Sequence, residues 1–239
     1  PPPPSRLLAL TDPSARKAID PIARALQAQY EAWQPRARFH FYLDPAVEDV
    51  KKWCLALRRS LPAPDERVLL HFNGHGVPRP TTRGELWLFS RDFTKYNPIS
   101  IADLHAWLGS PCCFVIDCSN SGRVLEALMA AHGDGGGGAG RGDCSGGTGN
   151  GDHRSFGIDL IMLVACGADE ELPTSHHLPA DVFTCCLTTP VKMALRSACA
   201  DGLLDVGDEL VSGLPGSASD RRSPVGELNW IFTAITDAI

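Results

Sequence analysis

Two short apolar runs that stop abruptly at polar residues constrain the fold of this chain more than any other feature. Residues 68–76 read Val-Leu-Leu-His-Phe-Asn-Gly-His-Gly, and residues 112–118 read Cys-Cys-Phe-Val-Ile-Asp-Cys. Such runs are typical of strands buried on both faces of a parallel sheet. Because the carboxyl ends of parallel strands line the ligand crevice of an α/β sheet, we expect His75 and Cys118 to lie side by side at one edge.

The remaining elements alternate between strands and helices. Apolar spacing and start signals predict helices over 20–34, 44–61, 101–108, 123–131, 179–187, 189–199 and 225–239. Strict alternation predicts a strand over 36–43, and short apolar runs predict strands over 85–89 and 158–166. This order predicts an α/β layered domain with a mostly parallel sheet. The last helix has no stop signal, so we expect the natural chain to continue beyond it.

Composition narrows the classes of partner and compartment. A length of 239 residues suits one large domain or two small ones, and the net charge of −6 comes with no long basic block, which argues against nucleic acid. No apolar run approaches the length of a membrane span. The nine cysteines include no Cys-x-x-Cys and sit mostly in apolar runs. They read as small buried hydrophobes in a reducing compartment, so we expect a cytoplasmic protein.

The Gly-rich stretch 132–154 is predicted to be a flexible insertion within a single domain that spans residues 1–239. It lacks the aliphatic and aromatic side chains that would offset the entropy of ordering. A zinc site built from His132, Cys144 and His153 would match no usual ligand spacing, and the pair His176-His177 reads as solvated. No phosphate loop is present, and we expect no metal and no cofactor.

Cys118 is the first candidate for chemistry. It follows a strand and precedes a helix, and a helix N-terminus would lower the pKa of its thiol towards neutral and supply N–H groups for an oxyanion. The alternative is a buried packing cysteine. Asp117 would raise the thiol pKa if it faced the sulfur, but neighbouring side chains in a strand point to opposite faces.

His75 is the second candidate. A histidine between two glycines could meet the thiol at the sheet edge and act as its base. The alternative is an ordinary loop residue on the surface. Asn73 and Asn120 could orient the imidazole, although asparagine at a strand end is more often plain turn chemistry.

Longer motifs narrow these readings to one family. The His-Gly and Asp-Cys strand ends resemble those of the caspase-like cysteine peptidases. The chain further resembles the N-terminal caspase-like domain of the Raptor family, the regulatory-associated proteins of TOR. The stretches that carry this resemblance are Gln29–Arg38, Asn73–Thr81, Gly84–Trp87, Asp117–Asn120, Pro179–Thr184, Cys186–Pro190 and Gly226–Ala234.

The resemblance implies a caspase-like three-layer sandwich with helices on both faces of a mostly parallel sheet. It also implies a scaffold of TOR complex 1, with the TOR kinase, the complex's other subunits and substrates carrying TOR-signalling motifs as partners. His75 and Cys118 match the catalytic dyad positions of the fold, although members of the family are not established peptidases. The family's first strand is expected to lie upstream of Pro1, and the Gly-rich insertion falls where caspases carry a cleavable linker.

Three functions follow from these readings. The favoured one is a non-catalytic scaffold that recruits and presents substrates to a kinase. The alternative is an active cysteine peptidase that uses Cys118 and His75, for which no acid-reading specificity pocket can be assigned. An unrelated hydrolase or nucleotide-binding domain would need a Gly-x-Ser-x-Gly elbow or a phosphate loop, and the sequence has neither.

Overall fold

A computed structural model describes residues 13–133, 159–173, 178 and 180–236. Its contacts divide the chain into two compact units. The first comprises Pro1–Asp20 with His40–Leu172, and the second comprises Pro21–Phe39 with Pro173–Ile239. The assignment of residues 1–239 to a single domain stays a prediction.

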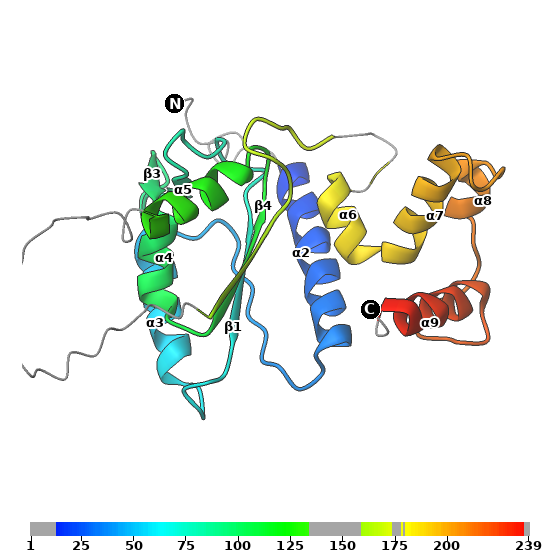
Figure 1. The fold of residues 1–239 in the computed structure, drawn as a ribbon, viewed down its shortest axis with the longest axis horizontal. Coiled ribbons are helices and arrows are strands. Elements are labelled where there is room, and N and C mark those ends of the chain that lie inside the picture. Colours follow the sequence, from blue (N-terminus) through cyan, green and yellow to red (C-terminus); the bar gives the residue numbers. More distant parts are fainter. Residues whose placement is uncertain (1–12, 134–158, 174–177, 179, 237–239) are drawn as a thin grey trace, which may run out of the picture. The chain divides into compact units, whose positions relative to one another are not determined.

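A parallel sheet forms the centre of the first unit. Its strands are β1 (Val68–Asn73), β4 (Cys112–Asp117) and β5 (Leu160–Val164), in the order β1-β4-β5 (Figure 1). Both pairings are parallel, and Asn73 stands opposite Asp117 at the end of the first one. The prediction that the two key runs are adjacent parallel strands is therefore confirmed.

A second, smaller sheet holds β2 (Leu86–Phe89) and β3 (Tyr96–Ile99) as an antiparallel pair. β2 was predicted from its apolar run. β3 was missed because it contains Asn97 and Pro98, two residue types that are depleted in strands.

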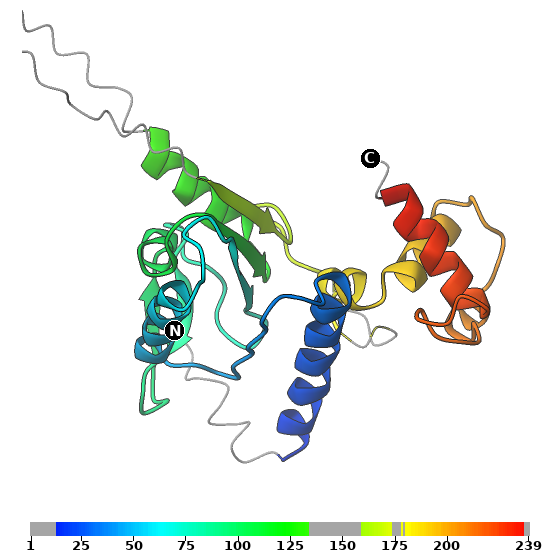
Figure 2. The ribbon, with the colours of Figure 1, turned by 90° about the horizontal axis from the view of Figure 1, so that it is seen from below.

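Three helices cover one face of the parallel sheet. They are α3 (Val47–Arg59), α4 (Ile101–Leu108) and α5 (Gly122–Gly133), and they gather on the same side of the sheet in both views (Figure 1, Figure 2). Alternate strand residues face them, because side chains in a strand point to opposite faces in turn. The resulting core includes Cys54, Leu104, Leu108, Val124, Leu128, Val68, Cys112, Phe114, Ile116 and Cys118.

The second unit is helical where the structure describes it. It holds most of α2 (Pro13–Trp33), together with α6 (Val182–Thr188), α7 (Pro190–Ala200), α8 (Asp208–Ser212) and α9 (Pro224–Thr236). The helix predicted over 179–187 is present but begins at Val182, where the Asp181 carboxylate caps it by accepting a hydrogen bond from the Thr184 N–H at 3.0 Å. The start predicted for α2 at Asp20-Pro21 is wrong, since the helix begins at Pro13 and runs through Pro21.

The strand predicted over Arg36–Leu43 is also wrong. Its backbone pairs with no strand among the described residues. Instead, the Tyr42 ring stacks on Trp53 of α3, with the ring centroids 3.5 Å apart. Alternation favours an extended backbone, but a strand also needs a neighbouring strand to satisfy its N–H and C=O groups.

Two other sequence-based expectations concern the Gly-rich insertion and membrane spans. Of the flexible insertion predicted over 132–154, residues 134–154 lie outside the described part of the chain, while His132 and Gly133 form the end of α5. No helix in the described ranges is long and apolar enough to cross a membrane.

Candidate functional site

The carboxyl edge of β1 and β4 brings the predicted site segments together. The Gly74 N–H donates to the Asp117 carbonyl at 2.8 Å, which carries the strand pairing one residue past β1. His75 and Cys118 therefore follow adjacent strand ends, as expected. Gly74 also has to be a glycine: a Cβ there would lie 2.4 Å from Cε1 of Phe72 and 3.1 Å from Cβ of Cys118.

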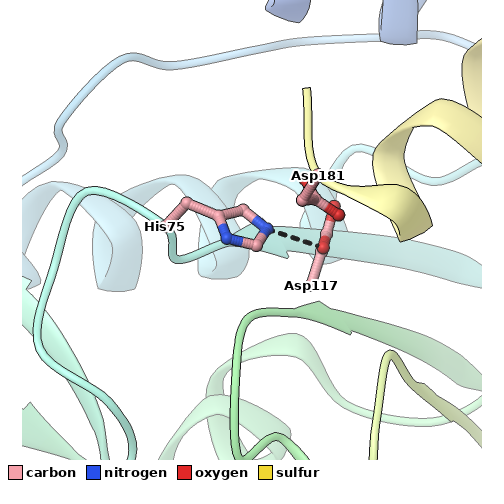
Figure 3. Close-up of side chains that lie close together, drawn as sticks. All are labelled: His75, Asp117 and Asp181. Carbon is pink, nitrogen blue, oxygen red and sulfur yellow. Dashed lines mark hydrogen bonds and ion pairs between the residues drawn. The ribbon is translucent and has the colours of Figure 1, made fainter. Parts of the chain in front are cut away.

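His75 is oriented by Asp117. Its Nε2 lies 2.9 Å from Oδ1 of the Asp117 carboxylate, and the dashed line in Figure 3 marks this contact. The Asp117 side chain is fully buried, whereas that of His75 is 29% exposed. The imidazole thus has one nitrogen held from inside the protein while part of the ring meets solvent.

Two further β1 side chains converge on the same carboxylate. Asn73 donates from Nδ2 to Oδ2 of Asp117 at 3.2 Å, and Nε2 of His71 lies 3.6 Å from the same oxygen. A buried carboxylate is tolerated only when it is hydrogen-bonded or paired with positive charge, and these groups supply that environment. Asn73 therefore positions Asp117, which in turn positions His75.

His71 was not predicted as a site residue, and Asp117 was predicted to affect only the thiol of Cys118, not His75. A signal for both was available. His71 and Asn73 alternate with Leu70 and Phe72 in β1, so the two polar side chains share the face opposite the core. A histidine and an asparagine on one face of a buried strand require a polar partner on the next strand.

Cys118 lies in the hydrophobic core cluster and is only 3% exposed. Burial raises the pKa of its thiol to about 12, and the neighbouring Cys166 and Asp117 add to this increase. The expected lowering of the thiol pKa by a helix N-terminus is therefore wrong. The helix begins only at Gly122, and loss of hydration outweighs any dipole from it.

The loops that follow β4 and β5 are joined by their backbones. The Asn120 N–H donates to the Glu170 carbonyl at 2.8 Å, and its side-chain Nδ2 donates to the Ala168 carbonyl at 2.9 Å. A Cβ on Gly122 would lie 2.4 Å from the Ala168 nitrogen. Asn120 thus belongs to the loop structure, which is the turn role that the sequence left open for it.

The chemistry of this edge is that of an imidazole held by the buried Asp117 carboxylate, while the neutral thiol of the next residue, Cys118, lies in the hydrophobic core. A cysteine nucleophile acts as the thiolate, and burial disfavours the thiolate of Cys118. The dyad roles of His75 and Cys118 stay predictions, as does the absence of a cofactor.

Of the candidate zinc ligands considered from the sequence, Cys144, His153 and the pair His176-His177 lie outside the described residues.

Comparisons with known proteins agree with the fold and with the motifs. Residues 1–128 match the family model of the Raptor N-terminal CASPase like domain. The chain is 45% identical over 240 residues to "Regulatory-associated protein of TOR 1" of Arabidopsis thaliana, covering 98% of this chain and 17% of that protein. It is 40% identical over 267 residues to "Target of rapamycin complex 1 subunit KOG1" of Saccharomyces cerevisiae, again covering 98% of this chain and 17% of that protein.

A solved structure gives the same result. The crystal structure of Chaetomium thermophilum Raptor superposes with a TM-score of 0.74 at 44% sequence identity, over 95% of this chain and 19% of that one. The caspase-like α/β fold is thereby confirmed. The chain spans less than a fifth of the length of each of these three proteins.

Proposed function

The chain belongs to the Raptor family, and from that premise we propose that it serves as a non-catalytic scaffold domain of TOR complex 1. In this role it helps to recruit substrates with TOR-signalling motifs and to present them to the TOR kinase in the cytoplasm. The names of its relatives, among them a target of rapamycin complex 1 subunit, support the proposal.

The burial of the Cys118 thiol is the structural observation that supports a non-catalytic role for the domain. A peptidase of the caspase type needs a thiolate at this position, at an edge that substrate can reach. Here the thiol is 3% exposed, and burial holds its pKa at about 12. At neutral pH a thiol with that pKa is almost wholly protonated and is therefore a poor nucleophile.

The test compares binding with catalysis in the full-length protein that carries this domain. Cys118→Ala is expected to leave co-precipitation of the TOR kinase unchanged and phosphorylation of a bound substrate undiminished, because the thiol takes no part in either. Cys199→Ala, in the part-exposed surface of α7, is the matched control. Loss of kinase and substrate together from a folded Cys118→Ala protein would contradict the proposal.

The alternative, an active cysteine peptidase, is tested by the pH dependence of alkylation. Iodoacetamide at pH 6 is expected to label the exposed Cys186 before Cys118 in the native protein. The peptidase reading requires the reverse, namely a Cys118 that is alkylated faster than the other cysteines at pH 6. Labelled positions are read by mass spectrometry after digestion.

A further inference from the structure

A second cysteine, Cys166, follows the end of β5 much as Cys118 follows the end of β4. The last registered pair between β4 and β5 is Ile116 with Val164, and the Ala165 N–H then donates to the Ile116 carbonyl at 3.1 Å. Cys118 is the second residue after Ile116 and Cys166 is the second residue after Val164, so both lie just past the ends of the paired strands. Neighbouring strands lie about 4.8 Å apart, so two cysteines that follow the ends of such strands start close to the Cα separation of about 4.4–6.8 Å that a disulfide requires.

The thiol of Cys166 is directed towards Cys118. Its Sγ donates to the Cys118 carbonyl at 3.5 Å and lies 3.6 Å from the hydroxyl oxygen of Ser121. The Cys166 N–H donates to the same Ser121 hydroxyl at 3.0 Å. These contacts hold the end of β5 against the turn that begins at Cys118. The fold of the backbone therefore brings the two cysteines together.

The two thiols differ in access. Cys118 is buried, whereas Cys166 is part-exposed. The proximity of Cys166 is also one cause of the raised pKa of Cys118, as expected for two thiols that share one environment. An oxidant arriving from solvent therefore meets Cys166 first, and Cys118 is the nearby thiol that can resolve the oxidised product.

We propose that Cys118 and Cys166 form an oxidation-sensitive pair, which a peroxide converts into a disulfide joining the ends of β4 and β5. This site is independent of the proposed scaffold function.

The conversion takes two steps. In the first step the Cys166 sulfur attacks one oxygen of hydrogen peroxide, the O–O bond breaks, and the thiol proton leaves with the other oxygen as water. In the second step the Cys118 sulfur attacks the sulfur of the Cys166 sulfenic acid, and because burial keeps Cys118 in its thiol form this step is the slower of the two. The S–O bond breaks, and the leaving hydroxide takes the Cys118 proton to form a second water. Two thiols and one peroxide thus give one disulfide and two waters.

The disulfide would lie at the same sheet edge as His75 and Asp117. Asp117 directly precedes Cys118, and its carboxylate holds the imidazole. Oxidation would therefore place a covalent link between the ends of β4 and β5 at the sheet edge that carries the candidate site.

The test treats the native full-length protein with hydrogen peroxide, blocks the remaining thiols and maps disulfides by mass spectrometry of an unreduced digest. The expected main product is a peptide pair joined through Cys118 and Cys166, which dithiothreitol separates. Cys166→Ser should abolish this product and keep the fold, because a serine hydroxyl can still meet Ser121.

Cys113→Ser is the matched control. Cys113 lies on the same strand, but its registered neighbour on β5 is Ile161, which offers no thiol. This variant should form the Cys118–Cys166 disulfide as the unchanged protein does. The proposal is overturned if oxidation ends at the sulfinic acid of Cys166, if another cysteine pair is the main disulfide, or if the Cys166→Ser protein gives the same cross-link pattern.

Discussion

Gly74 and Gly76 flank the same histidine, yet they face different surroundings. A Cβ on Gly74 would meet Phe72 at 2.4 Å, whereas a Cβ on Gly76 would meet nothing within 4 Å. Gly74→Ala is expected to destabilise the protein by about 1–3 kcal/mol, the usual cost of overpacking. Urea unfolding should show this loss, and Gly76→Ala is its matched control. Equal unfolding midpoints for the two variants would contradict the packing described at this edge.

A second prediction for a single residue concerns the Asp117 carboxylate. Asp117→Asn keeps the shape of the side chain but removes the charge that accepts from Asn73 and faces two imidazoles. We expect Asp117→Asn to lower the free energy of unfolding by about 1.5–3 kcal/mol, the range for hydrogen bonds to charged groups. Urea unfolding measures this change.

A double-mutant cycle with His75→Ala isolates the contact between Asp117 and His75. Its coupling energy should fall between about 0.5 and 3 kcal/mol, because the two side chains touch. Asp205→Asn, which removes a carboxylate from an exposed residue, should show none of these effects. Additive effects of Asp117→Asn and His75→Ala would mean that Asp117 does not orient the ring.

At the scale of elements, Arg58 ties α3 to the turn before β4. Its guanidinium donates to the carbonyls of Leu108, Gly109 and Pro111, and also to that of Glu66. This fork reaches several carbonyl oxygens of one tight turn at the same time, and an ammonium cannot reproduce the geometry.

Arg58→Lys is therefore expected to lower the free energy of unfolding by about 1.5–3 kcal/mol. Thermal and urea unfolding check the change. Arg59→Lys, at the neighbouring exposed position, is the control and should differ little from the unchanged protein. If both substitutions behaved alike, the turn would not depend on the fork.

Local sequence predicted the start of α4 better than it predicted those of α2 and α3, which begin at Pro13 and Val47. The bounds of α4, with its Ser100 cap, came directly from the sequence, and those of α6 and α7 nearly so. A capping side chain and a proline act within one turn, so tertiary contacts are not needed to recognise them. The strand predicted over Arg36–Leu43 was wrong for the opposite reason. Whether an extended segment becomes a strand depends on a partner strand that is distant in the sequence.

At the scale of the whole molecule, buried thiols couple stability to alkaline pH. Burial raises the pKa of Cys118 to about 12 and that of Cys54 to about 11, from 9.0 for a free thiol. The unfolded chain releases these protons first as the pH rises. The associated stability is therefore fully present below pH 9 and is lost between pH 9 and about 12, at about 1.4 kcal/mol per unit of pKa difference.

Unfolding midpoints measured from pH 8 to pH 11 should therefore fall more steeply for the unchanged protein than for a variant that carries both Cys54→Ala and Cys118→Ala. All other groups are common to both proteins, so the difference between the two curves is the quantity to compare. Cys199→Ala serves as the control for removing a thiol from a less buried position. Parallel curves would show that the two buried thiols do not contribute.

The sequence by itself determined that β1 and β4 are neighbours and that His75 and Cys118 follow their ends. Buried parallel strands have a local signature, and their carboxyl ends share one edge. Only the tertiary structure decided what these residues contact. The partner of His75 is the Asp117 carboxylate, and Cys118 lies in a dry core that raises the pKa of its thiol. Side-chain direction and hydration depend on what packs from elsewhere in the chain, which no local pattern records.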